Sequence, residues 1–237
     1  MELKLKLMKR GEDKMTYSLP SLDLLSEKLV GSVDWPADKP FLAFRFQPRR
    51  APKGLPIQDM VSRRKYVCRT TYYGNKSGIP AASPCCSEFG LKLSPFRSMA
   101  EYKRTTMRTH KRYFVNPFSA YMAGNHKEED RVYYSQYLPK TKGISVRKAG
   151  KIVGMMSIIR FPKNGRSYTP CSWISWLWVD GALPKEERKA AHAMLGGWLK
   201  KLPGRYFGGA IHAVNLKSQR WFLKMGARPV QVFFLRR

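Results

Sequence analysis

The C-terminal part of the chain, residues 143–237, carries a regular succession of hydrophobic patterns that restricts the fold more than any other feature. Short alternating or β-branched runs predict strands, and longer runs with apolar residues at helical spacing predict helices. In order, the patterns predict strands at 144–147, 152–161 and 172–180, a helix from 184, a strand at 206–214, a helix at 216–225 and a strand at 230–235. The order β-β-β-α-β-α-β predicts an α/β (α+β) fold with a mixed central sheet and flanking helices.

Two local signals in this part support these boundaries. Lys148-Ala149-Gly150-Lys151 separates the first two strands and is typical of a hairpin turn. The first helix has Pro184 at its start and acids at Glu186 and Glu187, where the helix dipole favours negative charge. We expect one face of this helix to pack on the sheet through Ala190, Ala191, Met194, Leu195, Trp198 and Leu199.

The region before residue 115 has weaker patterns. They predict strands at 3–8 and 40–50 and helices at 98–112 and 117–129. Residues 47–97 are rich in Pro, Gly, Ser, Lys and Arg, and we expect them to be largely irregular. The sequence therefore predicts a basic N-terminal extension, residues 1–114, followed by an α/β domain, residues 115–237.

The chain has a formal net charge of +29 at pH 7, from 45 Lys and Arg against 16 Asp and Glu. Residues 1–40 hold seven basic and seven acidic side chains, so the whole excess lies after residue 40. Such a field attracts polyanions, and nucleic acid is the partner that we expect, with DNA favoured over RNA. An anionic membrane surface is the alternative, but no helix pattern has a large apolar face opposite its lysines.

Basic residues gather in three clusters between residues 49 and 112, interleaved with tyrosines. The candidate nucleic-acid-binding residues are Arg49, Arg50, Arg63, Arg64, Lys65, Lys103, Arg104, Arg108, Lys111 and Arg112. Cations beside aromatic rings suit phosphate contacts together with base stacking, for which Tyr66, Tyr72, Tyr73, Tyr102 and Tyr113 are the candidates. A solvated basic face is the alternative, but it would normally contain interspersed acids.

Four cysteines in 237 residues do not form a disulfide framework, and the first residues lack the core of a signal peptide. We therefore expect an intracellular, cytoplasmic and reducing location. The cysteines are Cys68, Cys85, Cys86 and Cys171. Their spacing fits no standard zinc pattern even with His110 or His126 added, so we predict buried thiols and no metal.

Two segments give the α/β domain a resemblance to a known family. RKAAHA (188–193) follows the third strand of the domain and NLKSQRWFLKMGA (215–227) follows the fourth. The first is similar to the Gln/Arg-x-x-Gly-x-Gly/Ala motif of the GNAT acyltransferases. The second matches a further GNAT pattern at Asn215, Ser218, Phe222, Gly226 and Ala227. Over about residues 115–237 the chain resembles a divergent GNAT acyltransferase.

The resemblance implies a cofactor, acetyl-CoA or another acyl-CoA, and the residues that would bind it. Backbone N–H groups at a helix N-terminus would hold the pyrophosphate, and the preceding strand would face the acyl carbonyl. The implied cofactor-binding residues are Leu177, Val179, Arg188, Lys189, Ala191, Ala193 and Asn215. Ala191 stands where the family has glycine, and Phe222 stands where it often has a tyrosine that can protonate the leaving thiolate.

A narrower resemblance involves Leu177-Trp178-Val179-Asp180 and the Leu183-Pro184-Lys185 that follows. This pair of segments is similar to the Mom-type DNA-modification proteins of phages, which are GNAT-like and modify adenine in DNA with an acyl-derived group. It implies a nucleic acid substrate, DNA base modification and a phage-encoded protein acting in a bacterial host.

Three polar residues are candidates for catalysis: Ser175, Asp180 and His212. Asp180 ends a strand, where it could accept a proton or stabilise the start of the next helix. His212 lies near the C-terminal end of a strand, where α/β sheets bind ligands, and the alternative is a satisfied core histidine. Ser175 alternates with large residues, and its alternative role is that of a small packing residue.

Two functions therefore stay open at the level of the sequence. The first is an acyl-CoA-dependent N-acyltransferase that acts on nucleic acid. The second is a non-catalytic nucleic-acid-binding or virion-associated protein that keeps the fold without the chemistry. Ala191 and Phe222 favour the second function, and fold alone does not decide between the two.

Overall fold

We describe the fold from a computed structural model of the 237-residue chain. The structure describes residues 6–10, 14–19, 24–33, 41–46, 66–81, 88–114, 135, 138–161, 171–212 and 215–236. The chain forms two compact units, each built from segments that are distant in the sequence. The first unit contains Met1–Tyr73, Ala210–Leu223 and Ala227–Arg237, and the second contains Gly74–Gly209 and Lys224–Gly226.

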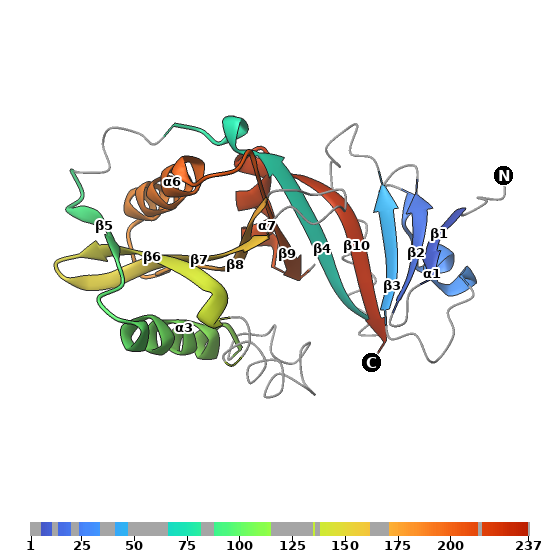
Figure 1. Ribbon diagram of the computed structural model, residues 1–237, viewed down its shortest axis with the longest axis horizontal. Helices are drawn as coiled ribbons and strands as arrows, with labels where there is room; N and C mark the ends of the chain where they lie inside the picture. Colours follow the sequence, from blue (N-terminus) through green and yellow to red (C-terminus); the bar gives the residue numbers. More distant parts are fainter. Residues whose placement is uncertain are drawn as a thin grey trace. The chain divides into compact units, whose positions relative to one another are not determined.

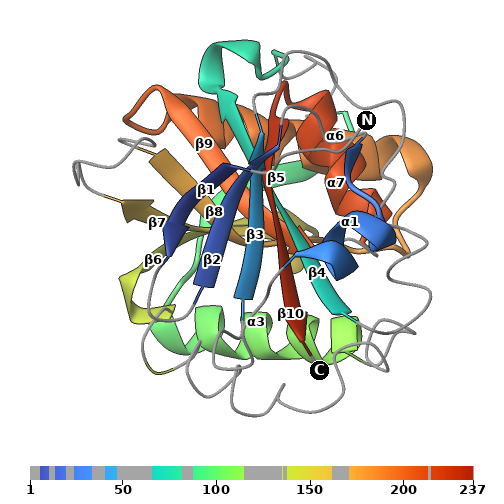
Figure 2. The ribbon, with the colours of Figure 1, turned by 90° about the vertical axis from the view of Figure 1, so that its right-hand side faces the viewer.

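The first unit is built on a mixed sheet. Its elements are β1 (Lys6–Arg10), β2 (Lys14–Leu19), α1 (Glu27–Ser32), β3 (Phe41–Phe46), most of β4 (Tyr66–Asn75), most of α7 (Leu216–Lys224) and β10 (Arg228–Arg236). The strands lie in the order β1-β2-β3-β10-β4, and only the β2–β3 pair is parallel among these described strands (Figure 2). The centre of this sheet is fully buried at Leu42, Phe44, Tyr72, Val232 and Phe234.

The second unit has an antiparallel sheet with a parallel strand at one side. Its elements are β5 (Leu91–Pro95), α3 (Met99–Phe114), β6 (Thr141–Lys148), β7 (Lys151–Phe161), β8 (Cys171–Val179), α6 (Lys185–Lys201) and the first part of β9 (Tyr206–His212). Strands β5 to β8 are antiparallel in chain order, and β9 is parallel to β8. Helices α3 and α6 cover opposite faces of this sheet (Figure 1).

Local sequence explains how these elements begin and turn. The β6–β7 hairpin turns at Ala149 and Gly150, with φ of 46° and 77°, which is the conformation of a type I′ turn. Helix α3 begins with a side-chain cap: Ser98 Oγ accepts from the Glu101 N–H at 3.1 Å, and Glu101 accepts from the N–H of Arg97, the residue before Ser98, at 2.8 Å. The Arg147 guanidinium also donates to Glu101 at 2.7 Å and ties α3 to β6.

The structure confirms the predicted fold class, a mixed α/β fold with flanking helices. Elements β6, β7, β8, α6, β9, α7 and β10 follow one another in the predicted order. The helix expected at 98–112 is α3, whereas the helix expected at 117–129 lies outside the described residues.

The structure adds two elements to the N-terminal part. Residues 47–97, which we expected to be largely irregular, contain the strands β4 and β5, which the sequence patterns do not predict. The division at 114/115 also fails to match the compact units: β10 pairs with both β3 and β4, and α3 belongs with β6 to β8. Long-range strand pairing, which leaves no local mark in the sequence, decides both points.

Candidate active site

A bulge in β8 lies at the centre of the candidate site. Opposite residues in β7 and β8 pair as Ser157 with Trp176 and Ile158 with Ile174, so Ser175 is an extra residue in β8. The Ser175 hydroxyl donates to the Ser157 carbonyl at 3.2 Å. Ser175 therefore takes part in the bulge, and its predicted role in catalysis stays a prediction.

Beyond this bulge β8 runs past its parallel neighbour. The β8–β9 ladder joins only Cys171, Ser172 and Trp173 to Tyr206, Phe207 and Gly208 in β9. Residues 174–179, including the predicted cofactor-binding Leu177 and Val179, continue β8 outside this ladder. A strand edge of this kind can bind an extended ligand through backbone N–H and C=O groups.

The loop between β8 and α6 is fixed by two of the predicted site residues. Asp180 Oδ1 accepts from the Ala182 N–H at 3.1 Å, and the Asp180 N–H donates to the Val153 carbonyl at 2.8 Å. Arg188 donates through Nη1 to the Gly181 and Leu183 carbonyls at 2.7 and 2.9 Å. Asp180 therefore stabilises the turn that leads to α6, and Arg188 holds the same turn from the helix.

The structure corrects the atoms expected to bind a pyrophosphate. Helix α6 starts at Lys185 after the N-cap Pro184, so Arg188–Ala193 lie beyond its first residues. The N–H groups of Ala191 and Ala193 lie in the helix interior, where intrahelical hydrogen bonds use them, and the Ala191 side chain is fully buried. The N–H groups of residues 185–187, in the first turn, have no intrahelical carbonyl to donate to and are therefore the ones that could bind an anion.

The first turn of α6 also carries two acids that a bound phosphate would meet. Each one is paired with a lysine: Glu186 with Lys189 at 2.8 Å on the surface, and Glu187 with Lys148 at 2.7 Å. The predicted Lys189 is therefore already engaged by a carboxylate. These pairs reduce the negative charge at the helix start without removing it.

The segment NLKSQRWFLKMGA forms α7 and both of its ends. Asn215 is the N-cap, because its Oδ1 accepts from the Ser218 N–H at 3.1 Å. At the other end Gly226 has φ of 81°, and the Ala227 N–H donates to the Phe222 carbonyl at 3.0 Å, as in a Schellman motif. A Cβ at Gly226 would also lie 3.2 Å from the Gly78 carbonyl oxygen. The matched residue types thus have structural roles in this helix.

Phe222 lies in the core of the first unit. Its ring packs against Trp221 and Tyr72, with centroids 5.2 and 5.6 Å apart. The neighbouring Tyr72 hydroxyl donates to Gln219 Oε1 at 2.7 Å, and burial raises the pKa of Tyr72. The position that supplies a proton donor in many GNAT proteins is therefore occupied here by an apolar side chain.

His212 is held in its neutral form. Its Nδ1 is buried, with no hydrogen-bond partner among the described residues. Burial, with a smaller effect of the Arg69 charge, lowers the pKa of His212 from 6.5 to about 3. His212 and Asn215 belong to the first unit, whereas Ser175, Asp180 and Arg188 belong to the second.

The His212 shift predicts how stability depends on pH. Between pH 6.5 and about 3 the unfolded chain binds a proton at His212 that the folded chain does not. The contribution of neutral His212 to the unfolding free energy is therefore fully present above pH 6.5 and is lost as the pH falls toward 3. We expect His212→Asn to flatten the fall of the unfolding free energy in this range by about 1.4 kcal/mol per pH unit. Urea denaturation at pH 4 to 7 measures this effect, and an unchanged slope would contradict the shift.

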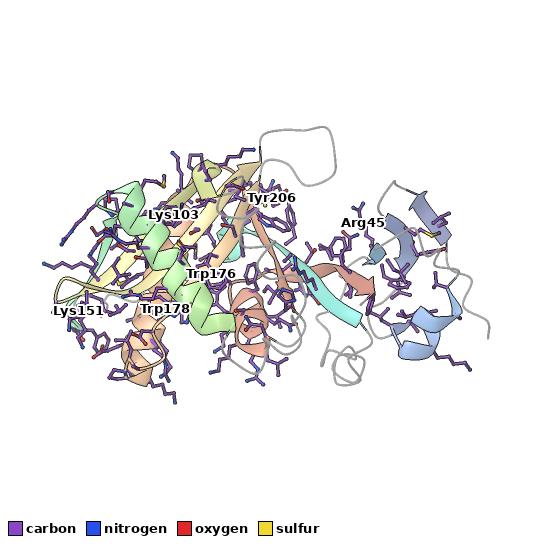
Figure 3. All side chains as sticks on the ribbon, turned by 90° about the horizontal axis from the view of Figure 1, so that it is seen from below. Arg45, Lys103, Lys151, Trp176, Trp178 and Tyr206 are labelled. Atoms are coloured by element: carbon purple, nitrogen blue, oxygen red, sulfur yellow. The ribbon has the colours of Figure 1, made fainter. Side chains whose placement is uncertain are left out.

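The predicted nucleic-acid-binding residues divide between described and undescribed parts of the chain. Lys103, Arg104 and Arg108 are exposed on α3 (Figure 3 labels Lys103). Lys111 and Arg112 lie on the same helix, with side chains outside the described part. Arg49, Arg50, Arg63, Arg64 and Lys65 lie wholly outside the described residues.

The structure also corrects the role expected of two tyrosines. Tyr72 and Tyr102 are 0% and 3% exposed, so they cannot stack on nucleic acid bases. Tyr102 belongs instead to a hydrogen-bonded network under α3, whose residues are not among those predicted for the acyl site. The spacing of Tyr102, Thr106 and Thr109, at i, i+4 and i+7, was the signal that places hydroxyl groups on one helix face.

Cys171 is a buried free thiol, and burial raises its pKa to about 12. Cys85 and Cys86 lie outside the described residues, as does the side chain of Cys68. Within the described ranges no group of three or more His, Cys, Asp or Glu side chains could hold a metal ion. No helix among these same ranges combines the length and the apolar character that a membrane span needs.

Comparison with known proteins finds only distant structural similarity. No protein-family model matches the chain, and no curated protein matches it. A conserved protein of unknown function from Staphylococcus epidermidis ATCC 12228 aligns with 100% of this chain and 95% of its own, at 9% identity and a TM-score of 0.49.

Two GCN5-related N-acetyltransferases also align with the chain. The protein from Sphaerobacter thermophilus is matched over 98% of this chain and 74% of its own, at 11% identity and a TM-score of 0.46. The protein from Kribbella flavida is matched over 83% and 68%, at 10% identity and a TM-score of 0.44. Identities of 9 to 11% and TM-scores of 0.44 to 0.49 transfer neither a family nor an activity to this chain.

Proposed function

We propose that the chain is a GNAT-like N-acyltransferase that uses an acyl-CoA and acts on nucleic acid. The observation that carries this proposal is the end of β8. The strand is bulged at Ser175, extends past its ladder with β9, and leads through a braced turn directly into the N-terminus of α6. The GNAT resemblance implies the same sequence of features at the acyl-CoA site.

The backbone of this region fits an acyl-CoA. Residues 175–179 would bind the acyl group and the part of CoA next to it through backbone groups. Residues 185–187 would bind phosphate through N–H groups at the positive end of the helix dipole. The acyl-CoA supplies an activated acyl thioester. The β8 N–H groups would stabilise negative charge that develops on the acyl carbonyl oxygen.

The titratable groups at hand favour an acceptor that is uncharged at neutral pH. Asp180, the predicted catalytic acid or base in the same unit as β8, has one carboxylate oxygen engaged in a turn. An exocyclic amine of a nucleobase carries no positive charge at neutral pH, unlike a lysine side chain, so it needs no strong base before attack. In this proposal the thioester C–S bond would break as the amide bond forms, CoA would leave as its thiolate, and Asp180, in the same unit as β8, would accept the amine proton.

The net charge of +29 and the exposed cations of α3 support a nucleic acid acceptor. The resemblance at Leu177–Asp180 to Mom-type phage proteins supports DNA over RNA and a base as the modified group. The cytoplasm of a bacterial host is then the proposed location. Mass spectrometry of nucleosides from cells that express the protein tests this part, and unmodified nucleosides would contradict it.

One group of observations favours the alternative, a non-catalytic nucleic-acid-binding or virion-associated protein on the same fold. Glu186 and Glu187 occupy the helix turn that would bind phosphate, and Arg188 donates to loop carbonyls. Phe222 offers no proton to a leaving thiolate. This alternative predicts polyanion binding without acyl-CoA binding.

Calorimetry with acetyl-CoA separates the two functions. We expect the wild-type chain to bind acetyl-CoA, and we expect Glu186→Gln to tighten binding about threefold, because it removes a negative charge from the phosphate-binding turn. Glu186 lies in an exposed pair, so the substitution leaves the fold intact. Exposed Glu88 provides the matched control, and Glu88→Gln should change nothing. No binding at millimolar acetyl-CoA would exclude the acyltransferase.

A further inference from the structure

A buried tyrosine on the inner face of α3 lies between that helix and the strands β6 and β7. Tyr102 is 3% exposed, and its ring packs on Phe96 with centroids 4.7 Å apart. A Cβ added at Gly143 would come within 2.7 Å of the Tyr102 ring. The glycine in β6 therefore provides the space in which the ring is held.

The Tyr102 hydroxyl connects α3 to one residue of the bulge. It donates to Ser157 Oγ at 2.5 Å and lies 2.6 Å from Thr141 Oγ1. Ser157 stands opposite the bulge in β7, and its carbonyl accepts the hydrogen bond from Ser175. Polar contacts thus lead from Tyr102 through Ser157 to Ser175.

A second set of contacts connects the same helix to the next residue of β8. Thr106 Oγ1 donates to the Tyr102 carbonyl, and Thr109 Oγ1 donates to the Thr106 carbonyl, both at 2.9 Å. The Trp176 indole N–H donates to Thr109 Oγ1 at 2.9 Å (Figure 3 labels Trp176 beside α3). Helix α3 therefore contacts Ser175 through Ser157 and contacts Trp176 directly.

Buried hydroxyl groups restrict geometry strongly, because each loses much free energy when it has no partner. A β-bulge, in turn, redirects the backbone groups of its strand. A network that fixes the bulge therefore also fixes where the following β8 N–H groups point. Those are the groups that the proposed function assigns to the acyl carbonyl.

We infer that Tyr102 is a positioning residue of the acyl site, and this inference rests on the proposed acyltransferase function. Its hydroxyl holds Ser157, and through Ser157 the bulge at Ser175, in the geometry that directs β8 N–H groups at an acyl carbonyl. Tyr102 contacts neither acyl donor nor acceptor. Its effect is specific to the acyl group, because the pyrophosphate is assigned to α6.

The test compares two variants that each remove one buried tyrosine hydroxyl. Tyr102→Phe removes the hydroxyl from the network, and Tyr72→Phe, the matched control, removes one that donates to Gln219 in the first unit. Binding of acetyl-CoA and of free CoA is measured for both full-length variants. Hydrogen exchange of the amides at residues 174–179 is measured without ligand, and urea denaturation records the loss of stability.

We expect Tyr102→Phe to reduce the preference for acetyl-CoA over CoA about fivefold, through weaker N–H contacts to the acyl group. Exchange at 174–179 should become faster on the order of tenfold in the same variant. Tyr72→Phe should change neither quantity, although we expect both variants to lose stability. A purely structural role of Tyr102 would lower stability alone.

The outcomes distinguish this inference from the function on which it rests. Wild-type protein that binds neither ligand contradicts the proposed function. Wild-type protein that prefers acetyl-CoA, with an unchanged preference and unchanged exchange in Tyr102→Phe, contradicts the inference alone. Equal effects in Tyr72→Phe would contradict it as well.

Discussion

Replacing Lys76 by methionine is expected to lower the free energy of unfolding by about 3 kcal/mol. Lys76 is 4% exposed, and its ammonium group donates to Ser172 Oγ at 2.8 Å and to the Leu202 and Pro203 carbonyls at 3.0 and 3.1 Å. Both carbonyls follow the last turn of α6, where the helix dipole is negative. Methionine fills a similar volume but has no donor, so three acceptors lose their common partner.

Urea denaturation followed by circular dichroism measures this loss. Lys201→Met is the matched control, because Lys201 is an exposed lysine in the last turn of the same helix. We expect that control to change stability by less than about 0.5 kcal/mol. A loss below about 1 kcal/mol for Lys76→Met would show that the three acceptors find other partners.

The elements that the sequence predicts well are those that near neighbours determine. The β6–β7 turn needs positive φ at two adjacent positions, and Ala149-Gly150 adopts it. Helix α6 follows from Pro184, two acids and an apolar face, of which Ala190, Ala191, Leu195 and Leu199 are buried. Helix α7 follows from its N-cap asparagine and its C-terminal glycine. In each case the decisive contacts lie within a few residues.

The parts that were missed depend on contacts between distant segments. Val232 in β10 stands opposite Phe44 on one side and Thr70 on the other. Neither β4 nor the first unit can therefore be recognised before β10 is placed between its partners. Buried Lys76 belongs to the same category, because its acceptors lie more than 90 residues away.

In the candidate site, the motif matches predict the helices correctly but not the atoms that are free to bind a ligand. The spacing of Asn215, Ser218 and Gly226 predicts the helix correctly, yet the structure uses all three residues at the ends of that helix. The Arg188–Ala193 motif likewise marks α6 correctly but lies beyond the turn whose N–H groups can bind an anion. Short motifs specify backbone geometry, and chemistry depends on the groups that this geometry leaves available.

Removing the three exposed cations of α3 is expected to weaken nucleic acid binding on the order of 100-fold at 0.1 M salt. Lys103, Arg104 and Arg108 are exposed, whereas Tyr102 and Thr106 of the same helix are buried. Each phosphate contact contributes about 0.9 to the slope of log affinity against log salt, so the triple glutamine variant should show a slope shallower by almost 3. Fluorescence anisotropy with a labelled DNA duplex at several salt concentrations measures both quantities.

A second triple variant separates a binding surface on α3 from attraction by the net charge alone. Glutamine at Lys201, Lys217 and Arg220 removes the same charge from exposed positions on α6 and α7. Equal loss of affinity in the two triples would show that the overall field of the +29 chain attracts polyanions and that α3 is not the site. If α3 contacts phosphates, only the α3 triple variant shows a salt slope that is shallower by almost 3, and the control triple does not. An RNA duplex in the same assay tests the expected preference for DNA, since phosphate contacts alone would bind both polymers.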